Sequence, residues 1–238
     1  MDPALLAVAF VVTFVAATVQ GTVGFGFAVL SVPLLALMDS RLAPVPQLFL
    51  SLPLCIWVAW RDRRAIKIAE VSWILGGRLP GAGLGVVLLT TLSSRWLDGM
   101  IAAVVVVAVV IMGSGREVAR TRWTKFGAGV VSGTFAMVAS IGGPPLALLY
   151  GKSKGETLRA NLAAVFVLGL LVTIAVRQAA GAIHTTDVIL AAWLLPAVLL
   201  AAYVSGPLSS RVEGPPLRRA VLLISSLAAI GLLLRALW

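Results

Sequence analysis

Two glycine-rich clusters interrupt long apolar runs of the sequence, and each brings hydroxyl or amide side chains with it. Glycine allows close approach of the backbone, and proline removes a donor and breaks a helix. A helix broken in this way presents free N–H groups and the positive end of its dipole, a combination that binds anions. The residues predicted to bind a ligand are Gln20, Gly21, Thr22, Gly24, Gly26 and Ser31 in the first cluster, and Ser132, Gly133, Thr134, Ser140, Gly142, Gly143 and Pro144 in the second.

The same small residues have a second interpretation, which is close packing between membrane helices. For any single Gly or Ser, packing is the favoured interpretation. Two clusters of matching composition at corresponding places in the chain favour a binding site instead.

Arg78 is the only ionisable residue well inside a predicted membrane span, about 10 Å along the helix from its start at 1.5 Å per residue. A charge at such a depth is costly and is a functional hypothesis by default. Arg78 could hold an anion, line a cytoplasmic vestibule or extend to the basic interface. Asn161 begins an apolar run and could face the same cavity, although helix capping or helix contact fits it equally well.

Few charges and many apolar residues determine the fold class. Of the 238 residues, 60% are hydrophobic and 12% are charged, whereas a soluble domain is about half apolar and about a quarter charged. The apolar runs are long and continuous, which predicts an all-α polytopic membrane protein rather than a barrel of short alternating strands. The net charge of +10 comes from Lys and Arg clustered between these runs. That pattern indicates positive-inside loops and no nucleic-acid partner.

Eight hydrophobic segments are expected, each of roughly 17 residues or more. The first and fifth contain the two glycine-rich clusters and are predicted to be broken and re-entrant. The segments comprise residues 4–38, 44–60, 71–92, 96–112, 126–150, 160–176, 187–208 and 217–238.

The two halves of the chain match each other in order. An offset of 112 aligns residues 20–22 with residues 132–134, and an offset of 116 aligns residues 92–95 with residues 208–211. The drift between the offsets predicts a short insertion near residues 177–183. Repeats with broken helices in corresponding places are typical of secondary transporters. We therefore predict one transmembrane unit made of two repeats of four segments each, residues 1–113 and 114–238.

The distribution of Lys and Arg predicts how the repeats are oriented. If every segment crosses the membrane once, the loops divide these residues ten against eight, which is no bias. If the fifth segment turns back on itself, the division is fourteen against four, as the positive-inside rule expects. The duplication then makes the first segment re-entrant too. Each half has three crossings, so the second repeat is inverted and both termini lie on the outer face.

The two clusters also resemble the signatures of a known family. The stretch GTVGFGFAVLSVP at residues 21–33 resembles the first signature of the TauE/SafE sulfite-exporter family, and GTFAMVASIGGPPLALLY at residues 133–150 resembles the second. The resemblance covers essentially the whole chain. It implies movement of sulfur-containing anions, such as sulfite or sulfonates, across the inner membrane, with export as the expected direction. Phe25 and Phe27 interrupt a motif that is Gly-Gly-Gly in many members, which leaves the substrate open.

The sequence therefore predicts a secondary transporter that exports small sulfur-containing anions by alternating access at the two broken helices. A transporter of another anion such as a carboxylate, and an anion channel, are the alternatives, and a structural membrane subunit ranks below them. The expected partners are a small anion and the lipid bilayer, in a multi-pass inner-membrane protein. Proton coupling, which the lack of a mid-membrane carboxylate weakens, and a homodimer are left open.

No enzymatic activity is expected. A serine hydrolase needs a His or Lys partner for its serine at depth, and the sequence offers none. The ligands for a metal site are also lacking. The prediction therefore contains no catalytic residue, no metal and no cofactor.

Overall fold

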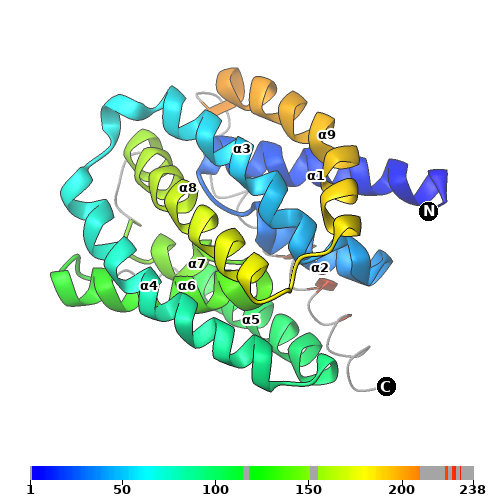
Figure 1. Ribbon diagram of the computed structural model, residues 1–238. Helices are drawn as coiled ribbons and strands as arrows, with labels where there is room; N and C mark the ends of the chain where they lie inside the picture. Colours follow the sequence, from blue (N-terminus) through cyan, green and yellow to red (C-terminus); the bar gives the residue numbers. More distant parts are fainter. Residues whose placement is uncertain are drawn as a thin grey trace.

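The computed structural model describes residues 2–114, 118–150, 155–209, 223–224, 227–228 and 231 (Figure 1). These residues form helices joined by short connections, and none of them lies in a strand. The expected all-α class is therefore observed for the described part of the chain.

The first apolar segment is broken into two helices, as predicted. Helix α1 (Pro3–Val23) ends at Gly24, which adopts a left-handed conformation with φ of 98°. Helix α2 (Phe27–Met38) begins after Gly26, whose φ is 115°. Glycine adopts these angles without steric cost, and so it ends one helix and starts the next within three residues. Helix α2 packs back against α1.

The fifth segment is broken in the same way. Helix α6 (Arg122–Ala139) ends at Ser140, which has a left-handed φ of 60°. Helix α7 (Gly143–Ala147) follows Gly142 and has prolines at its first positions, where a missing N–H costs nothing. Gly24 and Ser140 are 116 residues apart, as are Gly26 and Gly142.

The two helix breaks are therefore related by an offset of 116 residues, the same offset that relates residues 92–95 to residues 208–211. The offset of 112, which aligned residues 20–22 with residues 132–134, does not relate the breaks. Residues 132–134 lie in α6 one turn further from their break than residues 20–22 lie from theirs. With one offset for the breaks and the later helices, no insertion near residues 177–183 is needed.

The remaining helices pack against the two broken ones (Figure 1). Helix α1 packs against α9, and α6 packs against α4, while α3 contacts both α8 and α9. Each broken helix is therefore paired with a helix from the other half of the chain. The elements are α3 (Val45–Arg61), α4 (Ile68–Thr91), α5 (Ser94–Ser114), α8 (Gly155–Ala179) and α9 (Thr185–Ser209), with short 3₁₀ turns at Ser40–Leu42 and Arg63–Ala65.

Glycines bring α4 and α6 into backbone contact. A Cβ added to Gly133 would lie 2.6 Å from the carbonyl oxygen of Arg78, and one added to Gly81 would lie 2.9 Å from the carbonyl carbon of Val130. Neither position has room for a side chain. Small residues are the usual means by which membrane helices approach this closely.

Five helices are long and apolar enough to cross a membrane, among the residues that the structure describes. Eight segments were expected. Helices α2 and α7 are only 12 and 5 residues long because they are the second parts of broken segments. Helix α6 begins with Arg122 and Lys125, which shortens its apolar part, and the fourth segment contributes a shorter apolar stretch, Gly99–Ile111. The eighth segment, residues 217–238, lies almost wholly outside the described residues.

Candidate functional site

A small cavity of about 30 Å³ lies where the two helix breaks meet. Both breaks contribute to its wall, and so do the middle parts of α3, α4 and α8. Most of the lining is apolar, with a few polar groups, as is usual for small-ligand sites. The lining residues are Gln20, Phe25, Gly26, Ala28, Val29, Ser51, Cys55, Arg78, Ala136, Ser140, Ile141, Gly142, Gly143, Phe166 and Leu170.

Arg78 supplies a positive charge to this cavity. It lies in α4 and is only 4% exposed, and its Nη1 donates a hydrogen bond of 2.8 Å to Ser132 Oγ. Ser132 Oγ in turn donates to the carbonyl oxygen of Gly142, at 2.6 Å. This chain of bonds connects the guanidinium to the second helix break. Because Arg78 is buried, it does not extend to the interface, which was one of the three roles considered for it.

The space for the Arg78 guanidinium is provided by Gly169 of α8. A Cβ at Gly169 would lie 2.5 Å from Arg78 Cζ, far inside van der Waals contact. The guanidinium also lies 5.9 Å from the centre of the Phe166 ring. No carboxylate of the described residues lies within ion-pair distance of Arg78. The charge is therefore buried without an acidic partner.

Gln20 holds the first break. Its Nε2 donates to Cys55 Sγ at 3.2 Å, and its Oε1 accepts a hydrogen bond of 3.2 Å from the backbone N–H of Phe27. The next two N–H groups of α2, those of Ala28 and Val29, have no acceptor among the described residues, and both residues line the cavity. Unpaired N–H groups at the start of a helix are donors for a ligand.

Six of the predicted residues are brought together at the cavity, and the others lie beside it or in helix contacts. Those that line it are Gln20, Gly26, Arg78, Ser140, Gly142 and Gly143.

Ser132 and Pro144 lie directly behind this wall: Ser132 bonds to Arg78, and Pro144 is buried at the start of α7. Gly21 instead packs against Ser205 of α9, where an added Cβ would lie 2.5 Å from Ser205 Cβ. Ser31 is fully buried in α2. For Gly21 the close-packing interpretation describes its surroundings.

The remaining predicted residues contact neighbouring helices or their own helix instead of lining the cavity. Gly133 and Thr134 contact α4, with the Thr134 hydroxyl donating to the carbonyl oxygen of Gly81. The Thr22 hydroxyl donates to carbonyl oxygens of its own helix. Gly24 lies against Arg159, and Asn161 Oδ1 accepts a hydrogen bond of 2.7 Å from the Lys67 N–H.

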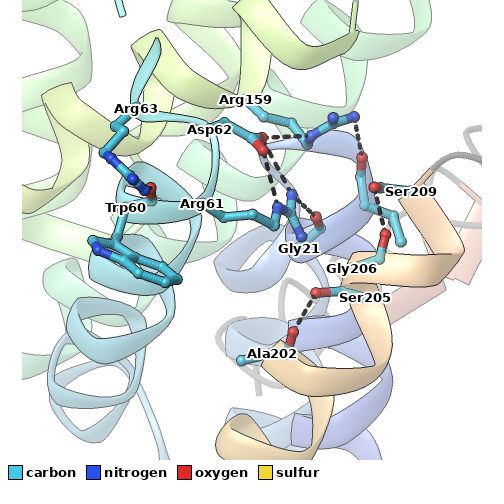
Figure 2. A network of polar contacts seen from close by, with 11 residues as sticks. Gly21, Trp60, Arg61, Asp62, Arg63, Arg159, Ala202, Ser205, Gly206 and Ser209 are labelled. Atoms are coloured by element: carbon cyan, nitrogen blue, oxygen red, sulfur yellow. Dashed lines mark hydrogen bonds and ion pairs between the residues drawn. The ribbon is translucent and has the colours of Figure 1, made fainter. Parts of the chain in front are cut away.

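A polar network at one end of the helices was not predicted (Figure 2). Asp62 follows α3 and is 7% exposed. Its carboxylate accepts hydrogen bonds from Arg61 Nε at 3.0 Å and from Arg159 Nε at 2.9 Å. Arg61 also donates to the carbonyl oxygen of Gly21, and Arg159 to that of Thr22, at the C-terminal end of α1. Burial raises the pKa of Asp62, but the hydrogen bonds from Arg61 and Arg159 outweigh it, so the pKa lies below 3.8.

Arg177, near the end of α8, has a comparable role at α6. It is 3% exposed and donates to the carbonyl oxygens of Met137 and Val138, close to the second break. Arg61 and Arg177 are 116 residues apart. Each places a cation at the C-terminal end of a broken helix, where the helix dipole favours positive charge.

The comparison with known protein families gives one match. The sequence model described as sulfite exporter TauE/SafE matches residues 9–232, which is nearly the whole chain. No curated protein and no solved structure matched. The chain therefore belongs to the sulfite exporter TauE/SafE family of membrane transporters.

Proposed function

We propose that this protein is a secondary transporter that moves small sulfur-containing anions, sulfite or organosulfonates, through the cavity between its two helix breaks. Arg78 holds the anionic group, and the free N–H groups of α2 and the side-chain amide of Gln20 complete its coordination. The expected direction is export across the inner membrane.

The observation that carries this proposal is the buried charge of Arg78. Among the described residues this cation has no acidic partner. A charge buried in an apolar wall is costly, and a bound anion would offset that cost. Two aromatic side chains, Phe25 and Phe166, also line the cavity. The cavity of about 30 Å³ is small, which favours a small anion over a large one.

Alternating access follows in this proposal from two inverted repeats, residues 1–113 and 114–238. Three observations support the repeats. The breaks are 116 residues apart, each broken helix packs against a helix of the other half, and residues of both halves line the cavity. The division of fourteen basic residues against four supports inversion and places the end with Arg61, Arg63 and Arg64 in the cytoplasm. Movement of one half against the other would then expose the cavity to each side in turn.

Flux into proteoliposomes tests the proposal, with sulfite, short sulfonates, carboxylates and sulfate offered in parallel. We expect saturable flux of sulfite or a sulfonate, and loss of that flux in Arg78→Gln. Arg122→Gln is the matched control, because Arg122 is exposed at the start of α6, where its guanidinium lies 5.7 Å from the centre of the Trp73 ring. Purification and thermal unfolding of both variants establish that they fold.

Each other outcome excludes the proposal in a specific way. Flux of carboxylates alone would show a different anion as substrate. Flux that does not saturate and exceeds a transporter turnover would indicate an anion channel. No flux of any anion would leave a structural subunit as the function. Unchanged flux in Arg78→Gln would remove Arg78 from the site.

A further inference from the structure

Asp62 and Arg159 connect the two halves of the chain through a buried ion pair. Asp62 lies at the end of α3, Arg159 lies near the start of α8, and the distance between Asp62 Oδ2 and Arg159 Nε is 2.9 Å. Both side chains are about 8% exposed. Figure 2 shows the guanidinium groups of Arg61 and Arg159 reaching the same carboxylate from two sides. The single carboxylate is therefore shared by one cation of each half.

The ion pair also holds α8 against the first helix break. A Cβ added to Gly24 would lie 2.9 Å from both Cα and Cγ of Arg159, so the backbone of α8 lies directly on the break. The Lys67 N–H donates to Asn161, two residues further along α8. The end of α3, the start of α4 and the start of α8 are thus joined beside the residues that begin the cavity wall.

The opposite end of the described helices has no such connection. The residues 116 positions from Asp62 and Arg159 are Gln178 and Ala43, which cannot form an ion pair. Arg177 is satisfied there by carbonyl oxygens of its own half. A second ion pair between the halves among the described residues, Arg120 to Glu70, spans 3.9 Å, is partly exposed and involves the start of α4.

We propose that the Asp62–Arg159 ion pair is the gate of the basic end: it closes that end of the cavity and separates when the cavity opens there. This inference rests on the alternating access proposed above. A buried ion pair is suited to this role, because its charges are poorly hydrated when closed and regain water when they separate. If Asp62 loses its charge, the ion pair that joins α3 to α8 is lost, and the open state becomes the more favourable one.

Cys55 is a built-in reporter for this gate. It is the only cysteine of the chain, it lines the cavity and it is 1% exposed. The experiment measures how fast an impermeant thiol reagent, 2-sulfonatoethyl methanethiosulfonate, modifies Cys55 in inside-out and in right-side-out membrane vesicles. Cys55→Ser vesicles give the background.

We expect Asp62→Asn to accelerate modification of Cys55 about tenfold or more in inside-out vesicles, which expose the cytoplasmic face, and not in right-side-out vesicles. Arg159→Gln breaks the same pair from the other side and should act in the same direction, which keeps the test valid if one variant does not fold. Arg159→Lys keeps the charge and should label more slowly than Arg159→Gln. Asp39→Asn is the matched control, because Asp39 is paired with Arg41 of its own half, away from the network.

An unchanged rate in folded Asp62→Asn or Arg159→Gln would overturn the gate, and so would an equal acceleration in Asp39→Asn. Acceleration only from the opposite face would place the gate at the wrong end and overturn it too. Labelling requires no substrate, so the result is separate from the flux assay. Normal flux with unchanged labelling would reject the gate alone, whereas absent flux would reject the proposed function.

Discussion

Replacing Gly169 by alanine should displace Arg78 from the cavity while leaving its charge in the protein. The added Cβ would lie 2.5 Å from Arg78 Cζ. Ordinary contact between carbon atoms requires about 3.5 Å, so the guanidinium must move by roughly 1 Å. A movement of that size breaks the 2.8 Å hydrogen bond to Ser132 and misaligns the donors that face the cavity.

The expected size of the effect on anion binding follows from the loss of one hydrogen bond to a charged group. A hydrogen bond to a charged group contributes about 1.5–3 kcal/mol. Since each 1.4 kcal/mol is a factor of ten, the apparent KM for the transported anion should rise roughly 10- to 100-fold. Sulfonate flux into proteoliposomes over a range of concentrations measures this value.

The matched control is Gly83→Ala on α4, where an added Cβ meets no atom within 4 Å. Its KM should stay unchanged. If Gly169→Ala folds and its KM also stays within about twofold of the original value, the position of Arg78 does not determine anion binding. The reasoning about the site would then be wrong.

Two further predictions concern stability. Gly81→Ala should lower the thermal unfolding temperature in detergent by several degrees. The added Cβ collides with the backbone of Val130, and overpacking of this kind costs about 1–3 kcal/mol of stability. An equal loss in Gly99→Ala, where the added Cβ has open space, would contradict this prediction. The pKa of Asp62 is lowered in the folded state, so its stabilising ion pairs persist above pH 3.8 and are lost as pH falls through the lower folded value. Unfolding temperature measured against pH should therefore fall less below pH 4 in Asp62→Asn than in the original protein, and identical curves would refute that assignment.

The helix breaks and Arg78 could be predicted because their signals are local. Left-handed backbone at Gly24 and Gly26 requires glycine, and a charge within an apolar run is visible without any structure. The distinction between binding and packing glycines could not be predicted, because it depends on distant partners. Gly21 faces Ser205, and Gly169 faces Arg78, at sequence separations that no motif spans.

The burial of Asp62 could not be predicted from the sequence, for a related physical reason. Asp62 lies among Arg61, Arg63 and Arg64, and such a charged stretch is usually a hydrated loop. Asp62 is covered by α8, and its partner there, Arg159, lies almost a hundred residues later in the sequence. The only sequence signal was the presence of a lone acid within a basic cluster, which can neutralise a neighbour as easily as face the solvent.

The exchange of partners between the halves has a consequence for synthesis of the protein. Helix α1 packs mainly against α9, and about 160 residues separate the end of the first from the start of the second. At ribosomal rates of about 5–20 residues per second, α1 waits roughly 10–30 s in the membrane before its partner is made. During that time its small-residue face is open to lipid or to a chaperone. In a truncated chain that stops before α9, that face of α1 would stay unpaired permanently, and the insertion machinery would bind an incomplete protein.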